Sequence, residues 1–224
     1  MRRDWERRAR ENARYYIATG REEWSDEEFF ASGEQEVRDH IRNDLGNICQ
    51  GRDPKTMKVL EIGCGTGRIT RALARFFGDV YAVDISEAMV RRARAELAEF
   101  PNAHIFRNNG RDLSALRGPW WRRIGTGESL QFDFAFSCLV FQHIPCRNVI
   151  ENYVSEVHRL LRPGALFKFQ VQGYTDEKPD LDDSWVGCSF SPEDARKLAE
   201  SNGFEMRYQA GAGDQYYWLW FFKS

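Results

Sequence analysis

One short stretch, residues 59–67, constrains the fold of this chain more than any other. Val59-Leu60-Glu61-Ile62 has the composition of a buried strand, and Gly63-Cys64-Gly65-Thr66-Gly67 follows at once. A helical pattern begins near Thr66, so the order is strand, glycine turn, helix. Glycines let the backbone turn tightly and approach a ligand, and a helix N-terminus offers free N–H groups and a positive dipole end. The stretch therefore predicts a site for a ligand that carries an anionic group.

Downstream, short apolar runs alternate with longer helical periods. We predict strands at 58–62, 80–83, 103–107, 132–138 and 166–172, and helices at 66–77, 86–100 and about 147–161. Near the C-terminus, Ser191-Pro192-Glu193-Asp194 predicts a helix start, and two further strands are expected at 204–208 and 215–222. This alternation indicates a parallel sheet. We expect a Rossmann-like, doubly wound α/β fold with a mostly parallel seven-stranded sheet and an antiparallel strand near the C-terminus.

The first fifty residues differ from this pattern and predict a helical extension. Trp5, Ala9, Ala13 and Tyr16 recur at spacings of three and four, and a capping box from Ser25 to Glu28 starts a second helix. We therefore expect an N-terminal helical extension at 1–50 and one catalytic domain at 51–224. The aromatic residues of the extension fit a lid over the site and fit plain core packing equally well.

Composition excludes several classes of protein. At 224 residues and 42% hydrophobic content the chain can bury one core, and a formal net charge of -2 gives no pull toward nucleic acid. No apolar run is long enough to span a membrane. Five cysteines without a C-x-x-C pair argue against a disulfide framework and against a metal site, and they favour a cytoplasmic location.

The spacing of the glycines separates two classes of cofactor. A dinucleotide fingerprint needs G-x-G-x-x-G, and its third glycine would fall at Arg68. The G-x-G-x-G of this chain instead suits a helix end that faces the carboxylate of a methionine moiety. A carboxylate at Asp84, the end of the second predicted strand, can accept hydrogen bonds from both ribose hydroxyls. Asp84 could also cap the next helix, but Ser86 already fills that role.

Four motifs, LEIGCGTG, VDISEAM, FDFAFS and LLRPGALF, occur in this order and resemble the class I S-adenosylmethionine (SAM)-dependent methyltransferases, in particular the small-molecule type 11 and type 12 domains. The resemblance covers residues 57–172 and implies SAM as cofactor and S-adenosylhomocysteine as product. It places Glu61 near the methionine amino group and Asp84 at the ribose. The other implied cofactor-binding residues are Gly63, Cys64, Gly65, Ile85, Met89, Asn109, Gly110 and Ser137.

Two departures from the family pattern concern the adenine end. The family often has Gly-Asp-Ala after the third strand, and here Asn109 and Gly110 take the Asp and Ala places. An asparagine carbonyl can accept a hydrogen bond from the adenine amino group as an acid does. The second departure is a longer loop between Leu113 and Phe132, with tryptophans and arginines at 120–123, which could cover the adenine edge or pack on the domain surface.

The acceptor should meet the methyl group near the C-terminal end of the fourth predicted strand, at residues 137–145, because ligands of open α/β sheets bind outside the strand ends. His143 is the candidate general base, since imidazole titrates near neutral pH. The alternative is that His143 only orders the loop or binds the cofactor through its ring, because methyl transfer can succeed by proximity alone. Tyr15, Tyr16, Gln142 and Trp185 are the candidate substrate or lid residues.

We therefore expect a methyltransferase that acts on an oxygen or nitrogen of a small molecule, in secondary metabolism, as a monomer or homodimer. Five acids at 176–183 could favour a cationic acceptor, although a solvated loop explains them as well. The alternatives are a SAM-binding sensor or partner protein without turnover and an NAD-dependent oxidoreductase.

Overall fold

The computed structural model of the chain describes residues 1–117, 130–174, 179, 180, 182 and 184–224. These residues form two compact units, 1–107 and 108–224. The loop residues 120–123, which could cover the adenine edge or pack on the domain surface, lie outside the described residues, and so do three of the five acids, Asp176, Glu177 and Asp183.

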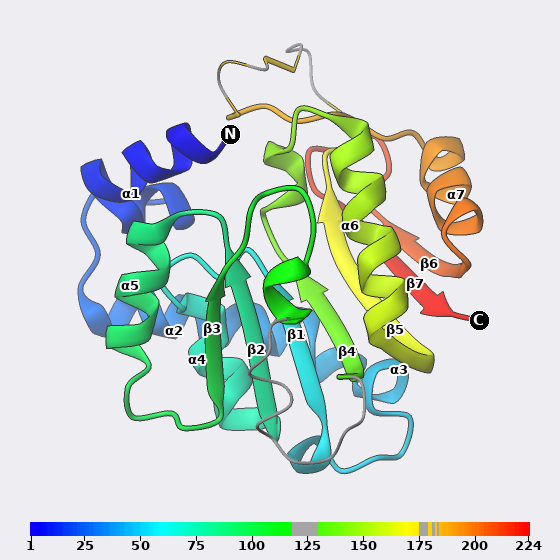
Figure 1. The fold of residues 1–224 in the computed structure, drawn as a ribbon, viewed down its shortest axis with the longest axis horizontal. Coiled ribbons are helices and arrows are strands. Elements are labelled where there is room, and N and C mark those ends of the chain that lie inside the picture. The colour runs from blue at the N-terminus through cyan, green and yellow to red at the C-terminus, as the bar shows by residue number, and fades with distance from the viewer. Residues whose placement is uncertain (118–129, 175–178, 181, 183) are drawn as a thin grey trace. The chain divides into compact units, whose positions relative to one another are not determined.

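Three parallel strands form the sheet of the first unit (Figure 1). Their order is β3 (Ala103–Arg107), β2 (Asp79–Asp84), β1 (Lys58–Ile62), and all three have buried apolar residues at their centres. The register places Ile62 beside Val83. Two helices, α4 (Arg68–Phe76) and α5 (Glu87–Glu96), follow β1 and β2. The predicted bounds of the strands at 58–62 and 103–107 are confirmed.

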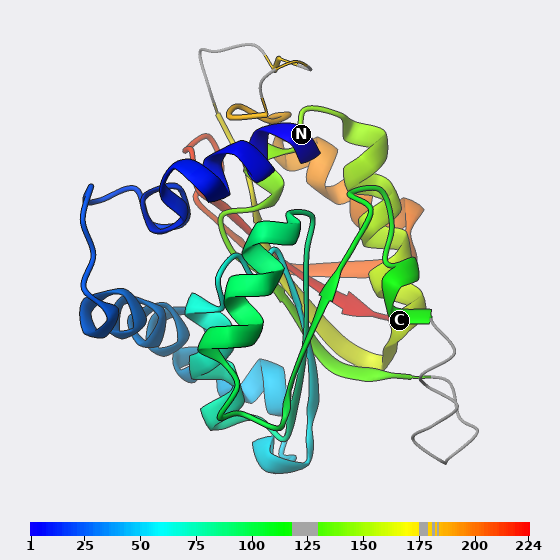
Figure 2. The same cartoon turned by 60° about the vertical axis from the view of Figure 1, so that its left-hand side comes forward.

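The N-terminal helices belong to this first unit. They are α1 (Arg2–Ile17), α2 (Asp26–His40) and α3 (Leu45–Cys49), with short 3-10 turns at Arg42–Asp44 and Pro54–Thr56. The capping box at Ser25 and Glu28 is present as predicted. Helix α1 packs on α5, and α2 packs on α4 (Figures 1 and 2). Within α1, Asn12 has non-helical angles, so the helix is kinked there.

The second unit has four strands in the order β4 (Phe132–Ser137), β5 (Leu161–Val171), β7 (Tyr217–Lys223), β6 (Phe204–Ala210). Strands β4 and β5 are parallel, whereas β7 is antiparallel to both of its neighbours. Its helices are α6 (Arg147–Leu160) and α7 (Pro192–Ser201), and 3-10 turns occupy Ser114–Arg117 and Phe141–His143. Strand β5 starts earlier than predicted, because Leu161 already pairs with Phe132 before the register shifts.

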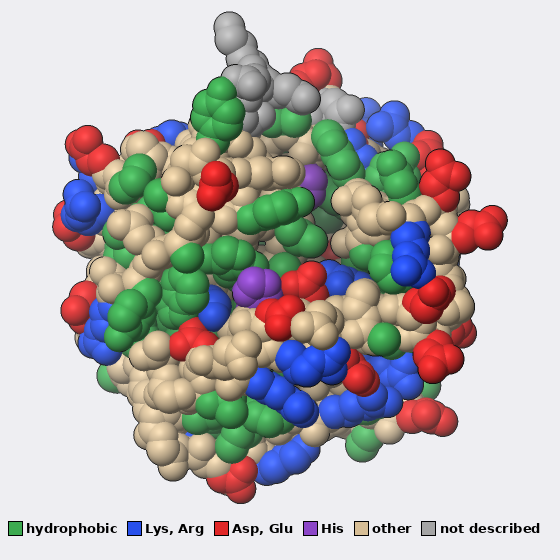
Figure 3. Space-filling view, turned by 180° about the vertical axis from the view of Figure 1, so that it is seen from behind, with side chains coloured by type: hydrophobic (Ala, Val, Ile, Leu, Met, Phe, Trp, Pro, Cys, Tyr) green, Lys and Arg blue, Asp and Glu red, His purple; other side chains and the backbone are tan. Residues whose placement is uncertain are grey.

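The expected fold class is confirmed, because the seven strands belong to one mostly parallel sheet with an antiparallel strand near the C-terminus. Among the described helices, none combines the length and apolar character needed to cross a bilayer. On the face seen in Figure 3, acidic and basic side chains are interspersed.

The contact between α2 and α4 depends on a glycine, and this generates a prediction. A Cβ atom at Gly33 would lie 2.1 Å from the carbonyl oxygen of Arg68. We expect Gly33→Ala to lower the free energy of unfolding by about 1–3 kcal/mol, because the two helices must separate. Gly46→Ala is the matched control, since a Cβ there meets nothing within 4 Å. Chemical denaturation measures both variants, and equal stabilities would contradict the prediction.

Candidate functional site

The glycine turn is held at the ends of β1 and β2 by hydrogen bonds from its own N–H groups. Gly63 and Cys64 donate to the carbonyl oxygen of Val83, at 2.8 and 3.1 Å. Gly65 donates to a carboxylate oxygen of Asp84 at 2.9 Å. The turn therefore brings together Gly63, Cys64, Gly65 and Asp84, four of the residues that the sequence assigned to the cofactor.

The positive φ angles of Gly65 and Gly67, 53° and 90°, explain why the turn needs glycine. Close packing adds a second reason. A Cβ atom at Gly65 would lie 2.7 Å from Cδ1 of Ile17, and one at Gly67 would lie 2.8 Å from Cδ1 of Leu97. The end of α1 therefore packs directly on the glycine turn.

Two carboxyl groups of this unit have raised pKa values. Burial raises the pKa of Glu61 to about 7, although Thr70 donates a hydrogen bond of 2.6 Å to it and Arg68 favours its charged form. Burial also raises the pKa of Asp84 to about 6, against the opposing effect of hydrogen bonds from the N–H groups of Ser86, Gly65 and Ile85. Both acids can therefore change their charge near neutral pH, and both would gain from a cationic or hydroxyl-bearing ligand.

Thr66 is a site residue that the sequence reasoning did not single out. It lies inside the glycine turn with 4% of its surface exposed, and its hydroxyl oxygen has no hydrogen-bond partner among the described residues. A buried hydroxyl normally has a partner, because leaving it unpaired costs free energy. The sequence shows a polar residue, Thr66, inside the G-C-G-T-G turn. Only the structure shows that the hydroxyl oxygen of Thr66 lacks a partner among the described residues.

Ile85 lies between β2 and α5, and Met89 lies in the first turn of α5, which α1 covers. Met89 is buried in a cluster with Ala9, Ala13 and Ala88, and Ile17 packs against this cluster. The carboxylate of Glu6 accepts hydrogen bonds from Ser86 Oγ at 2.7 Å and from the N–H of Ala88 at 3.2 Å. Helix α1 is thus held by apolar contacts and by a carboxylate at the positive end of α5.

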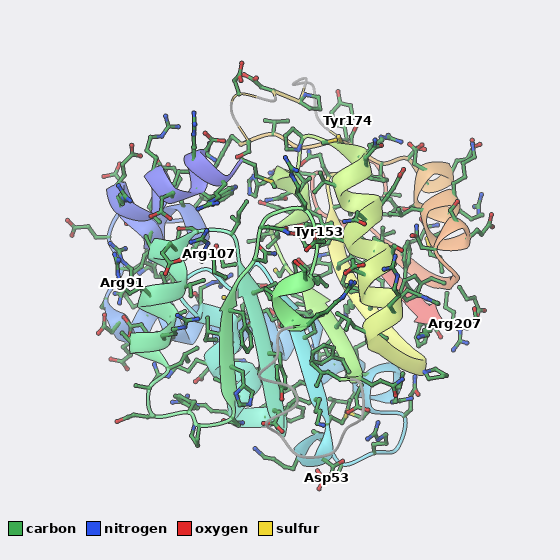
Figure 4. All side chains as sticks on the ribbon, viewed as in Figure 1. Asp53, Arg91, Arg107, Tyr153, Tyr174 and Arg207 are labelled. Carbon is green, nitrogen blue, oxygen red and sulfur yellow. The ribbon has the colours of Figure 1, made fainter. Side chains whose placement is uncertain are left out.

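Two of the aromatic candidates lie near the C-terminal end of α1. Tyr15 and Tyr16 follow the kink in α1, with ring centroids 5.1 Å apart in an edge-to-face arrangement. The Tyr16 hydroxyl donates to Glu11 at 3.1 Å. At the end of β3, Arg107 pairs with Glu87 at the start of α5, 2.8 Å away (Figure 4).

In the second unit, Asn109 and Gly110 lie in a turn that the Asn109 side chain stabilises. Its carbonyl oxygen accepts from the N–H groups of Arg111 and Asp112, at 2.7 and 3.0 Å. The preceding residue, Asn108, is buried and donates to the Tyr153 hydroxyl on α6 at 2.8 Å (Figure 4). An adenine amino group would have to share the Asn109 carbonyl with these two backbone groups.

Ser137, Gln142, His143 and Trp185 also belong to this unit. Ser137 is buried at the end of β4. The ring nitrogens of His143 contact Gln142 Nε2 at 3.1 Å and the carbonyl oxygen of Trp185 at 2.5 Å. The structure therefore brings together three residues that the sequence proposed for the acceptor or for catalysis. Over the described parts of the chain, no group of three or more His, Cys, Asp or Glu residues is placed to hold a metal ion.

The doubly wound sheet, the G-x-G-x-G turn and the acids at the ends of β1 and β2 define a class I methyltransferase architecture. Comparison with known proteins agrees. Residues 60–167 match the sequence model of the methyltransferase domain. Over these residues the chain is similar to methyltransferase domains, which is consistent with a class I SAM-dependent methyltransferase.

Two sequence relatives illustrate the range of this family. The chain is 26% identical to a sterol 24-C-methyltransferase of Debaryomyces hansenii over 72% of its length and 43% of the relative's length. It is 29% identical to a malonyl-[acyl-carrier protein] O-methyltransferase of Enterobacter lignolyticus over 63% of its length and 49% of the relative's. The chain thus spans less than half the length of these two relatives.

Solved structures share the fold. The magnesium protoporphyrin IX methyltransferase of Synechocystis, crystallised with S-adenosylhomocysteine, aligns with a TM-score of 0.64 and 20% sequence identity. The alignment covers 94% of this chain and 93% of that one. The same enzyme has also been crystallised with SAM. These alignments confirm the predicted fold, and the match to the methyltransferase domain agrees with the predicted enzyme class and its SAM cofactor.

The raised pKa of Glu61 generates a prediction about stability and pH. The folded protein holds a proton on this carboxyl up to a pKa of about 7, whereas the unfolded chain releases it at the ordinary value of 4.5. The free energy of unfolding therefore loses a contribution as pH rises from about 4.5 to 7. Glu61→Gln keeps the shape and removes the charge, so we expect the variant to gain on the order of 1–3 kcal/mol over the wild type between pH 5 and 8.

Denaturant unfolding at pH 5 and pH 8 measures this difference. Glu87→Gln is the control, because the hydrogen bond from Arg107 lowers the pKa of the exposed Glu87 and should give a small effect of the opposite sign. A stability difference between wild type and Glu61→Gln that does not change with pH would show that Glu61 ionises normally.

Proposed function

We propose that this protein is an enzyme that transfers the methyl group of SAM to an oxygen or nitrogen of a small-molecule acceptor. The observation that carries the proposal is the hydrogen bond between Gly65 and Asp84, which joins the glycine turn to the acid at the end of β2. A carboxylate can bind the hydroxyls of a ribose, and the glycine turn beside it can accommodate the charged methionine part of the cofactor.

The residues of the first unit fit this cofactor. The unpartnered hydroxyl of Thr66 offers a donor and an acceptor inside the turn. The carboxylate of Glu61 suits the amino group of the methionine moiety, and the carboxylate of Asp84 suits the ribose hydroxyls. Ile85, just before α5, and Met89, which α1 covers in this structure, are proposed to pack on the adenine, and Asn109, Gly110 and Ser137 are the remaining proposed contacts.

Bound SAM supplies an electrophilic methyl group on a positively charged sulfur. The work left to the chain is to bind, to orient and to exclude water, because alignment of the two reacting atoms is the main requirement of a displacement. Asp84 and Glu61 would fix the orientation of the cofactor at two points. Helix α1, packed on the glycine turn through Ile17, is the proposed lid, with Tyr15 and Tyr16 near its end.

The acceptor is proposed by chemical class only. The relatives are named for acceptors as different as a sterol and malonyl-acyl carrier protein, so the family leaves the acceptor open. Gln142 and Trp185 are the proposed contacts to it, and a role in secondary metabolism is part of the proposal. The absence of a C-x-x-C pair among the five cysteines supports the proposed cytoplasmic location, and the proposed assembly is a monomer or homodimer.

Isothermal titration with SAM, S-adenosylhomocysteine and NADH tests the cofactor. We expect both sulfur compounds to bind and Asp84→Asn to weaken that binding about 10- to 100-fold, because hydrogen bonds to a charged acceptor are lost. Asp79→Asn is the matched control, since Asp79 lies at the opposite end of the same strand and pairs with His104. Binding of NADH alone would overturn the proposal, and SAM binding without turnover of any acceptor would favour a sensor.

Thr66→Val tests the orphaned hydroxyl. We expect the free protein to be at least as stable as the wild type, because a buried group without a hydrogen-bond partner is replaced by a methyl group. We expect weaker binding of S-adenosylhomocysteine, by about 5-fold or more. Thermal unfolding and titration measure the two effects, with Thr56→Val as a control on an exposed threonine outside the turn. Loss of stability without loss of affinity would assign Thr66 a structural role.

A further inference from the structure

Three buried polar side chains lie around the loop that follows β4. Gln142, His143 and Gln170 are 6%, 9% and 0% exposed. Gln142 and His143 form part of the 3-10 turn Phe141–His143, and Gln170 is on β5. Buried amide and imidazole groups are costly unless they are hydrogen-bonded, so their partners are informative.

The three side chains form a continuous chain of hydrogen bonds. The N–H of Leu139 donates to Gln170 Oε1 at 3.1 Å, and Gln170 Nε2 donates to Gln142 Oε1 at 2.8 Å. Gln142 Nε2 lies 3.1 Å from His143 Nε2, and His143 Nδ1 lies 2.5 Å from the carbonyl oxygen of Trp185. The chain of contacts thus runs from one backbone N–H group to one backbone carbonyl group.

The two backbone ends fix the direction of every bond between them. A carbonyl oxygen can only accept, so Nδ1 of His143 carries a hydrogen and donates to Trp185. At the other end, the N–H of Leu139 can only donate, so Gln170 presents its oxygen there and its NH2 group to Gln142. Gln142 then directs its own NH2 group toward Nε2 of His143, which accepts. The imidazole is therefore the neutral Nδ1–H tautomer.

A proton on Nε2 would disrupt this order. The protonated nitrogen would face the NH2 group of Gln142, donor against donor. Rotating the Gln142 amide would relieve that contact but would place its NH2 group against the NH2 group of Gln170. Gln170 in turn cannot rotate without losing the bond from Leu139. The lone pair of the nitrogen that would act as a base is already in use.

The same series of hydrogen bonds connects two segments of the backbone. Residues 184–188 run beside the loop after β4, with Gly187 donating to the carbonyl oxygen of Gln142 at 2.7 Å and Cys188 donating to that of Ile144 at 3.0 Å. The His143 and Trp185 rings lie 5.0 Å apart, and 37% of Trp185 is exposed. Leu139 has a φ of 59°, which is a strained conformation for leucine. The hydrogen bonds hold this strained loop and the Trp185 backbone together.

We propose that His143 is a positioning residue and not the proton acceptor of the reaction. This inference rests on the proposed methyl transfer. Together with Gln142 and Gln170, the neutral imidazole fixes Trp185 beside the loop where the acceptor binds. The acceptor atom then arrives without its proton or loses it to a group other than His143.

The first test is the tautomer of His143 in the ligand-free protein. Long-range ¹H–¹⁵N correlation spectra distinguish a hydrogen on Nδ1 from one on Nε2, and His143→Asn identifies the signal by its loss. We expect Nδ1–H at pH 7.5. A hydrogen on Nε2 would overturn the proposal, and this result does not depend on any activity.

The second test compares two substitutions of His143 in methyl transfer. Asparagine can still donate a hydrogen bond to the Trp185 carbonyl but cannot accept a proton from the acceptor, whereas alanine can do neither. We expect His143→Asn to keep kcat within about 5-fold of the wild type. We expect His143→Ala to raise KM and to shift the tryptophan emission of the protein, because the Trp185 indole moves. His104→Asn, on β3 and paired with Asp79, is the control.

A general base would give a different pattern, with both substitutions lowering kcat by about 100-fold or more. That result would overturn the positioning role. If the wild type methylates no acceptor, the proposed function fails. The tautomer of His143 in the wild type and the tryptophan fluorescence of the two variants still test the positioning role.

Discussion

The carboxylate of Asp84 is the group on which the arrangement of the first unit depends. One of its oxygens accepts from Gly65 in the glycine turn, and the other accepts from Ser86 at the start of α5, each at 2.9 Å. A single side chain thereby fixes the turn after β1 and the helix after β2. Its burial raises its pKa to about 6, and the backbone N–H groups offset part of that cost. The group proposed to bind the ribose is therefore held in place before any ligand arrives.

Helix α1 packs on the elements that Asp84 organises. Glu6 binds Ser86 and the N–H of Ala88, and the small residues Ala9 and Ala13 let the helix approach Met89 closely. Moving α1 away would expose this apolar cluster. It would also remove the hydrogen bonds that Ser86 Oγ and the N–H of Ala88 donate to Glu6. If α1 is the proposed lid, opening it would cost buried apolar surface and these hydrogen bonds.

Local patterns in the sequence predicted the fold well. The strands at 58–62 and 103–107 have the predicted bounds, and the capping boxes at Ser25 and Ser191 start helices as expected. The misses are at boundaries set by tertiary contacts. Strand β5 begins at Leu161 because that residue pairs with β4, and α5 ends at Glu96, four residues before the predicted end at 100. A pattern of apolar residues does not show where a neighbouring strand continues the pairing.

The two halves of the candidate site differ in how far sequence can reveal them. The proposed cofactor residues from Glu61 to Met89 lie close together along the chain, between β1 and the first turn of α5, so their spacing carries the signal. The hydrogen bonds around His143 join residues 28 and 42 positions apart. The direction of each bond follows from the backbone groups of Leu139 and Trp185 at the two ends of the whole series. No motif encodes such an order. The sequence predicted that His143 belongs to the site, but its tautomer, which decides between a base and a positioning group, follows only from what each nitrogen contacts.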